Sequence, residues 1–129
     1  AIANDGIMMR PYVVSSIRDG ENKIIKEFKP KQIARIMNQN TADIITGMMI
    51  ETVESGTGTR AKVSKVDVAG KTGTAEVGGN QKSHAWFVGF APADSPQVAI
   101  AVLIENGGGG GSAAAPIASK VLKKAFSIK

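Results

Sequence analysis

Two short apolar runs constrain the fold more than any other feature of this chain. They span residues 84–91 and 97–104, and five residues separate them. In the second run, apolar residues occupy both alternating sets of positions from Val98 to Ile104. A period of two is typical of strands, and apolar residues on both sets predict a strand that is covered on both faces. Because so short a link leaves no room for a crossover, we expect the strands to pair antiparallel.

Two helices are expected to flank these strands. From Asn40 onward, apolar residues recur at the helical period, and the helix is expected to end near a glycine at position 56. Asn40 or Thr41 can cap its start, and Gly56 can end it in the left-handed conformation. A second helical stripe covers residues 112–126, with Pro116 in its first turn. Helices against an antiparallel sheet predict an α+β fold. The first stripe consists of Ile44, Ile45, Met48, Met49, Thr52 and Val53.

The first forty residues predict a less regular segment. Residues 1–3 run into Asn-Asp-Gly, which is typical of the end of a helix, so we expect the chain to begin inside a larger protein. Residues 7–17 and 23–28 are rich in apolar positions and flank a turn, which predicts a β-hairpin. Residues 31–37 indicate only a connecting turn or a short helix. Residues 1–129 are expected to form one unit without internal repeats.

Composition excludes several classes of function. The net charge is +5, but the basic residues are scattered and only 5% of positions are aromatic, so no nucleic-acid partner is expected. The chain has no Cys and one His, which argues against thiolate chemistry and a metal site. The longest uncharged stretch, residues 106–119, is too short to span a membrane as a helix. Because Cys is absent and His occurs once, we expect no metal site, and we expect no cofactor.

Two glycine-containing strings invite a ligand but lack the necessary spacing or context, and a run of glycines is assigned none. Gly70-Lys71-Thr72 ends like a phosphate-binding loop, but that loop requires a glycine where this chain has Lys65. The string at 56–61, Gly-Thr-Gly-Thr-Arg-Ala, follows a predicted helix instead of a strand, so we interpret it as a helix end and a loop. The five consecutive glycines at 107–111 indicate a flexible loop or linker.

The string Lys71-Thr72-Gly73-Thr74 has a more specific chemical use. On a strand, Thr72 and Thr74 fall on the same side and offer two hydroxyl donors to one anion. Gly73 lets another chain lie against the backbone, which can then pair with it as an added strand. Lys71 supplies a positive charge for a carboxylate. The string therefore predicts carboxylate recognition at a strand edge.

Together with its flanking segments, this string resembles a known family. The segments are Lys71–Glu76, then His84-Ala85-Trp86-Phe87-Val88-Gly89-Phe90-Ala91-Pro92, and before both Ala3-Asn4-Asp5-Gly6-Ile7-Met8-Met9-Arg10-Pro11-Tyr12. In this order they resemble the C-terminal part of the transpeptidase domain of class B penicillin-binding proteins. The superfamily carries Ser-x-x-Lys, Ser-Asp-Asn and Lys-Thr-Gly motifs. The resemblance implies a serine D,D-transpeptidase that cross-links peptidoglycan stem peptides and is acylated by β-lactams.

The resemblance also implies a role for each residue of the string. Lys71 is expected to assist proton movement and to attract the terminal carboxylate of the stem peptide. Thr72 and Thr74 are expected to bind that carboxylate, and Gly73 to keep the strand edge open. The backbone N–H of Thr74 is expected to donate to the oxyanion of the tetrahedral intermediate. Lys71 and Thr74 are thus the candidate catalytic residues.

One departure from the family pattern limits what this chain can do alone. No Ser is followed by Lys three positions later, and no Ser-x-Asn occurs. The chain alone is therefore expected to be inactive, with the rest of the transpeptidase domain as its partner. The resemblance places the protein at the cell membrane, on its extracytoplasmic face. Two alternatives remain open: a β-lactamase or β-lactam sensor of the same superfamily, and a non-catalytic module that binds acidic peptides at a strand edge.

Overall fold

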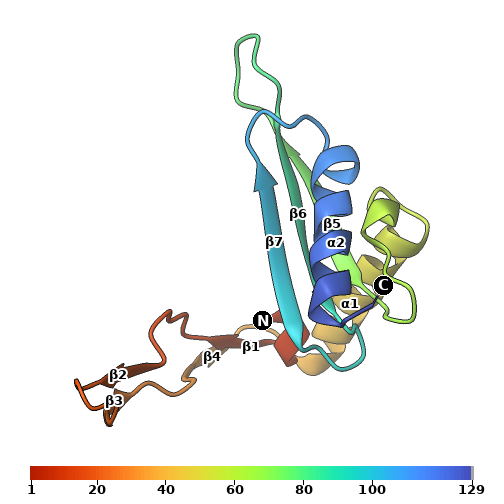
Figure 1. Ribbon diagram of the computed structural model, residues 1–129. Coiled ribbons are helices and arrows are strands. Elements are labelled where there is room, and N and C mark those ends of the chain that lie inside the picture. Colours follow the sequence, from red (N-terminus) through yellow and green to blue (C-terminus); the bar gives the residue numbers. More distant parts are fainter. Residues whose placement is uncertain (129) are drawn as a thin grey trace.

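The computed structural model describes residues 1–128 and has a three-stranded sheet at its centre. Strands β5 (Ala69–Ala75), β6 (His84–Ala91) and β7 (Val98–Ile104) lie in this order, and both neighbouring pairs are antiparallel. Figure 1 shows the three long strands side by side, with a helix across one face. The antiparallel pairing predicted from the short link is confirmed. So is the α+β class, because helices pack against this sheet.

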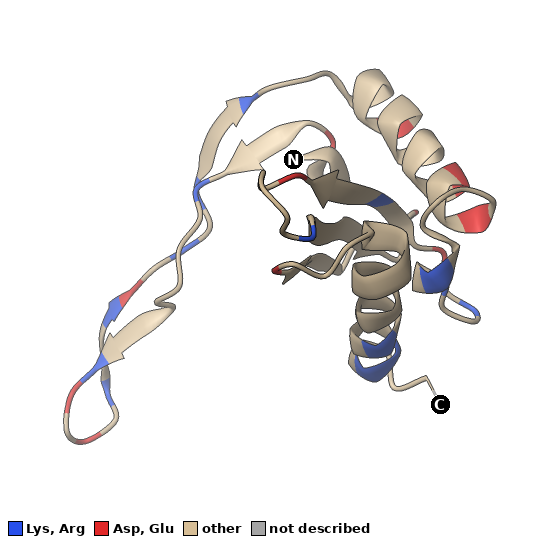
Figure 2. Ribbon diagram, turned by 90° about the horizontal axis from the view of Figure 1, so that it is seen from above, with Lys and Arg blue, Asp and Glu red and all other residues tan. Residues whose placement is uncertain are grey.

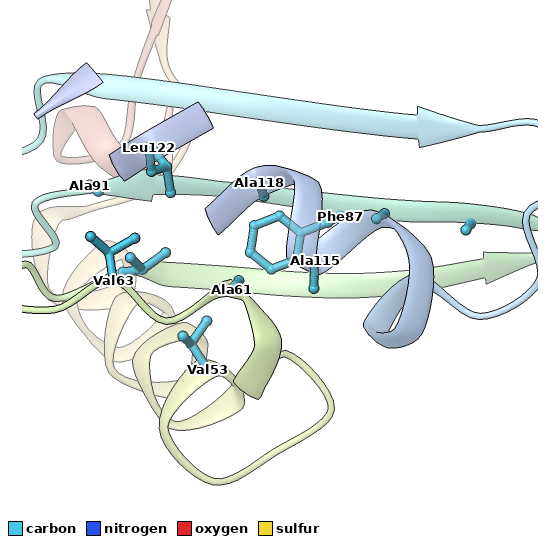
Figure 3. Close-up of a cluster of buried hydrophobic side chains, with 11 residues drawn as sticks. Val53, Ala61, Val63, Phe87, Ala91, Ala115, Ala118 and Leu122 are labelled. Atoms are coloured by element: carbon cyan, nitrogen blue, oxygen red, sulfur yellow. The ribbon is translucent and has the colours of Figure 1, made fainter. Parts of the chain in front are cut away.

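Helix α2 (Ala115–Ala125) covers one face of the sheet. Its buried residues recur at the helical period, and three of the four are Ala or Ser, so the helix axis can come close to the strands. Phe87 of β6 fills the space beneath the helix and is fully buried, as Figure 3 shows. Pro116 lies in the first turn of the helix, as predicted. The buried positions of α2 are Ala115, Ala118, Ser119 and Leu122.

Helix α1 (Gln39–Glu54) packs beside β5 and confirms the first predicted helix, although its ends differ from the prediction. Its cap is Asn38, whose Oδ1 accepts a hydrogen bond from the Thr41 N–H at 2.8 Å, and not Asn40 or Thr41. Gly56 does not adopt the left-handed conformation. The helix ends at Ser55 instead, and a Cβ at Gly56 would lie 2.9 Å from the Thr52 carbonyl oxygen. A close approach of backbone explains this glycine.

The apolar stripe predicted for α1 is buried only in part. Met49 and Val53 are buried against the sheet. Met48, which belongs to the same stripe, is 65% exposed in this chain. The two methionines are adjacent, so about 100° of helical rotation separates them, and only one can face the sheet.

The cap of α1 gives a simple test of this correction. We expect Asn38→Ala to lower the free energy of unfolding by about 1 kcal/mol, because it leaves the Thr41 N–H without its side-chain acceptor. Urea denaturation of the full-length protein measures the change. Asn40→Ala is the matched control and should change stability by less than about 0.5 kcal/mol. A larger effect at Asn40 than at Asn38 would contradict the cap assignment.

The N-terminal strands form two short antiparallel pairs in place of one hairpin. β2 (Ser16–Arg18) pairs with β3 (Ile24–Glu27), and β1 (Ile7–Met9) pairs with β4 (Gln32–Arg35). The β2–β3 pair forms an arm that extends away from the rest of the chain and carries several basic residues (Figure 2). The interpretation of residues 31–37 as a turn or short helix was wrong. Their mixed sequence does not show the alternation of a strand, because all four residues of β4 are exposed.

The far face of the sheet, opposite α2, is exposed along β7 in this chain. Ala99, Ala101 and Leu103 are exposed, while Val98, Ile100, Val102 and Ile104 are half-buried. The prediction that this strand is covered on both faces is therefore wrong for the chain as described. Among residues 1–128, no helix combines the length and the apolar character needed to cross a membrane.

Candidate functional site

The residues of the Lys-Thr-Gly-Thr string lie on β5, at one edge of the sheet. β5 pairs with β6 along one side only, so its other side is an open edge in the described chain. The Lys71 Nζ donates to the Thr72 carbonyl oxygen at 2.8 Å, and from this bond we infer that the carbonyl points to the open edge and not to β6. In an antiparallel ladder, alternate residues direct their backbone groups to the same side. The N–H groups of Thr72 and Thr74 therefore face the open edge too.

The hydroxyl side of β5 borders a pocket of about 440 Å³. Thr72 and Thr74 line one wall of it, on the face of the sheet that α2 covers. The second wall is the segment that follows α1, residues 56–60, and the third is the glycine segment after β7, residues 109–112. A volume of this size suits a small ligand or the end of a peptide. Three segments far apart in the sequence thus meet at the string.

Lys71 lies apart from the two threonine hydroxyls. Successive side chains of a strand point to opposite faces, so Lys71 shares the far face with Gly73, and it does not line this pocket. Its ammonium group reaches the open edge by bending back to the Thr72 carbonyl. The family resemblance implies that Lys71 and both threonines act on one carboxylate. The structure brings the threonines together and leaves the lysine at the edge.

The glycine segment packs directly against the strands of this site. Gly110 is buried at the start of a π-helical turn, Gly110–Ala114, that leads into α2. A Cβ on Gly110 would collide with the carbonyl oxygens of Trp86 and Gly73. The segment can therefore lie directly on the backbone of β5 and β6, and a side chain at position 110 would lift it away. Gly108 is held by a hydrogen bond from its N–H to the Ser83 carbonyl, at 2.9 Å.

Thr57 and Arg60 line the pocket, although the sequence did not indicate them as site residues. The Thr57 Oγ1 lies 2.6 Å from the Thr72 Oγ1, within hydrogen-bond distance. The Arg60 Nη1 donates to the Ser112 carbonyl oxygen at 3.4 Å. Both belong to the Gly-Thr-Gly-Thr-Arg string that we interpreted as a helix end and a loop. The sequence feature that could have indicated them is a polar, glycine-rich segment directly after a helix, because loops of this kind often carry binding residues.

His84 and the aromatic residues of β6 have structural roles. His84 accepts a hydrogen bond from the Asn106 backbone N–H on its Nδ1, at 3.0 Å, and so ties the start of β6 to the end of β7. Phe87 and Phe90 are buried in the two hydrophobic clusters of the chain. Trp86 packs on the far face, where a Cβ at Gly73 would lie 3.2 Å from its own Cβ. These aromatic residues therefore pack against the sheet and its neighbours.

Comparison with known proteins relates this arrangement to a family. Residues 1–123 match the penicillin-binding protein transpeptidase domain. The chain is 41% identical over 109 residues to the peptidoglycan D,D-transpeptidase PbpA of Mycolicibacterium smegmatis, which covers 82% of this chain and 22% of that protein. This chain thus spans about a fifth of the length of such relatives.

Solved structures show the same relationship. The D,D-transpeptidase domain of a peptidoglycan glycosyltransferase from Eggerthella lenta superposes with a TM-score of 0.88 at 38% identity, over 98% of this chain and 30% of that one. Penicillin-binding protein A from Mycobacterium tuberculosis, solved as a ceftriaxone acyl-enzyme, superposes with a TM-score of 0.89 at 38% identity. The match covers 97% of this chain and 30% of that one. The agreement confirms the class B resemblance that the motifs indicate, and this chain belongs to the penicillin-binding protein transpeptidase family.

Proposed function

We propose that this chain supplies the Lys-Thr-Gly-Thr strand of a peptidoglycan D,D-transpeptidase that cross-links stem peptides and is acylated by β-lactams. One observation carries the proposal. Thr72 and Thr74 line one pocket, and the backbone groups of the same residues face the open edge of β5. An extended peptide can pair with such an edge while its terminal carboxylate reaches the hydroxyls. The family relationship of the chain supports the same function.

Each residue of the string then has a task in acyl transfer. The Thr72 and Thr74 hydroxyls bind the terminal carboxylate of the stem peptide, and Gly73 leaves the backbone open to it. The Thr74 N–H donates to the oxygen that becomes negative in the tetrahedral intermediate, a position where one donor contributes much of the rate enhancement. Lys71, with its ammonium at the edge, attracts the carboxylate and assists proton movement.

The nucleophile is a serine from outside this chain, because no Ser here has the spacing of the first motif. Its hydroxyl attacks the peptide carbonyl, an ester bond forms, and the C-terminal residue leaves as an amine that takes up a proton. The amine of a second stem peptide then attacks the ester. A new peptide bond forms, and the serine oxygen regains its proton. With a β-lactam, the same attack opens the ring and leaves a long-lived ester.

The rest of the transpeptidase domain is the proposed partner of this chain's far face. A pocket of about 580 Å³ lies there, between the first residues of the chain, α1, β6 and β7. Its lining is almost wholly apolar and includes Val88, which is 42% exposed, and Leu103 on the same face is 44% exposed. Exposed apolar patches of this kind mark interaction surfaces.

The complete protein is proposed to act at the cell membrane, on its extracytoplasmic face.

Intact-mass spectrometry after incubation with benzylpenicillin tests the proposal. We expect the full-length protein to gain the mass of one penicilloyl group and to keep it for many minutes. This chain alone should gain none, since it lacks the nucleophile.

Three results would contradict the proposal. Absence of an adduct on the full-length protein would favour a strand-edge peptide-binding module. An adduct that forms and hydrolyses within seconds would indicate a β-lactamase. An adduct on this chain alone would show that the nucleophile lies within it.

A further inference from the structure

The pocket beside β5 contains one positive charge that the Lys-Thr-Gly-Thr string does not provide. Among the described residues that line it, Arg60 is the one charged side chain, and no Asp or Glu lines it. Lys71, the cation of the string, points to the other face of the sheet. The two threonine hydroxyls thus share their pocket with a guanidinium group. Two hydroxyl donors and a cation without a neighbouring carboxylate form a site for an anion.

The guanidinium of Arg60 keeps most of its hydrogen-bonding capacity for such an anion. It sits on the 3-10 helical turn Thr59–Ala61, and its Nη1 donates to the Ser112 carbonyl at 3.4 Å. Arginine has five N–H donors, so this single long bond leaves four others. Within the described residues, Arg60 makes no salt bridge, and the nearby Lys62 and Glu54 neutralise one another at 2.7 Å. A planar guanidinium can bind both oxygens of a carboxylate at once.

The hydroxyl of Thr57 orients the hydroxyl of Thr72. The two oxygens lie 2.6 Å apart, and a hydroxyl has one hydrogen to donate and two lone pairs to accept. When Thr57 donates to Thr72, the hydrogen of Thr72 is directed away from Thr57 and toward the pocket. The position of Thr57 is itself fixed, because its carbonyl oxygen lies against Gly111, where a Cβ would collide with it. Thr57 therefore positions a binding group and does not bind the anion itself.

We propose that Arg60 binds the terminal carboxylate of the substrate together with Thr72 and Thr74, and that Thr57 is the positioning residue for Thr72. This inference rests on the proposed function. It adds the segment after α1 to the binding site as its cationic wall. It also gives the Gly-Thr-Gly-Thr-Arg string a function, since its glycines let the segment lie close against the end of α1 and its last residue carries the charge. A β-lactam that carries a carboxylate should use the same group.

The test compares benzylpenicillin with its methyl ester, which lacks the negative charge. We expect Arg60→Gln in the full-length protein to lower the second-order rate constant of acylation by benzylpenicillin about tenfold. The rate constant with the ester should not change. Glutamine removes the charge and keeps an N–H donor on a shorter side chain, so the uncharged ester is the control for any loss of the bond to the Ser112 carbonyl. Arg60→Lys should restore the rate with benzylpenicillin to within about threefold of the wild type.

Two further variants separate binding from general damage. Arg18→Gln removes an arginine on the distant arm and should leave both rate constants unchanged. Thr57→Val should slow acylation by benzylpenicillin about fivefold and leave the ester unaffected, because it disturbs only the hydroxyl that meets the carboxylate.

Failure of this inference and failure of the proposed function give different results. If Arg60→Gln leaves the ratio of the two rate constants at its wild-type value, through no effect or through an equal loss on both compounds, Arg60 does not bind the carboxylate. If the glutamine variant fails to fold, Arg60→Met, which also lacks the positive charge, is measured in its place, and an unchanged ratio would again show that Arg60 does not bind the carboxylate. If the wild-type protein is acylated by neither compound, the transpeptidase proposal itself falls.

Discussion

Replacement of Thr74 by proline is expected to abolish acylation of the full-length protein by benzylpenicillin while the protein remains folded. Proline has no N–H, and the N–H of Thr74 is the proposed donor to the oxyanion. Loss of one such donor lowers acyl-transfer rates on the order of 100- to 1000-fold. The fold should survive because Thr74 directs its backbone groups toward the open edge of β5, where proline interrupts no pairing with β6.

Two companion variants make this result specific. Thr74→Ala keeps the N–H and loses only the hydroxyl, so we expect a loss of about tenfold. Lys71→Ala should abolish acylation as well, since it removes the group that moves the proton. Rate constants of acylation and the midpoint of thermal unfolding should be measured for each. If Thr74→Pro and Lys71→Ala both retain acylation, the assignment of this strand to the active site is wrong.

Substitution of Gly110 by alanine should damage both stability and the site. The added Cβ meets the carbonyl oxygens of Trp86 and Gly73, which belong to paired strands and cannot move independently. The π-helical turn would have to lift from the sheet, which also displaces Gly111 from its contact with Thr57. We expect the free energy of unfolding to fall by about 3 kcal/mol, at the upper end for overpacking. Guanidinium denaturation and the acylation rate measure the two effects.

The neighbouring glycine provides a matched control. A Cβ on Gly109 would lie 3.2 Å from the Ser112 Oγ and meet no backbone atom within 4 Å. The backbone of Gly109 is extended, at φ −83° and ψ 136°, a conformation that alanine adopts readily. Gly109→Ala should therefore change the free energy of unfolding by less than about 0.5 kcal/mol. Equal effects of the two substitutions would show that the segment does not rest on the strands as described.

Periodicity in the sequence was sufficient for the main elements. The stripe from Ile44 to Val53 predicted α1, because a helix with one buried face repeats its apolar residues at the helical period. The short apolar runs predicted β6 and β7, because apolar residues filled both alternating sets of positions. β4 was missed for the same reason, since its four residues are all exposed and carry no such repeat. The cap at Asn38 was missed by two residues because Asn occurs at both 38 and 40, and composition alone does not choose between them.

The Lys-Thr-Gly-Thr string on β5 separates the features that depend on sequence from those that depend on tertiary structure. The sequence by itself determined the family, the strand and the common side of Thr72 and Thr74, because these depend on residue order and on the period of two along a strand. Only the tertiary structure decided what else reaches that side. Arg60 and Gly110 come from segments before and after the sheet, and they meet Thr72 because of how α1 and α2 pack against β5 and β6. A pocket built from three distant segments has no period, so no local pattern in the chain records it.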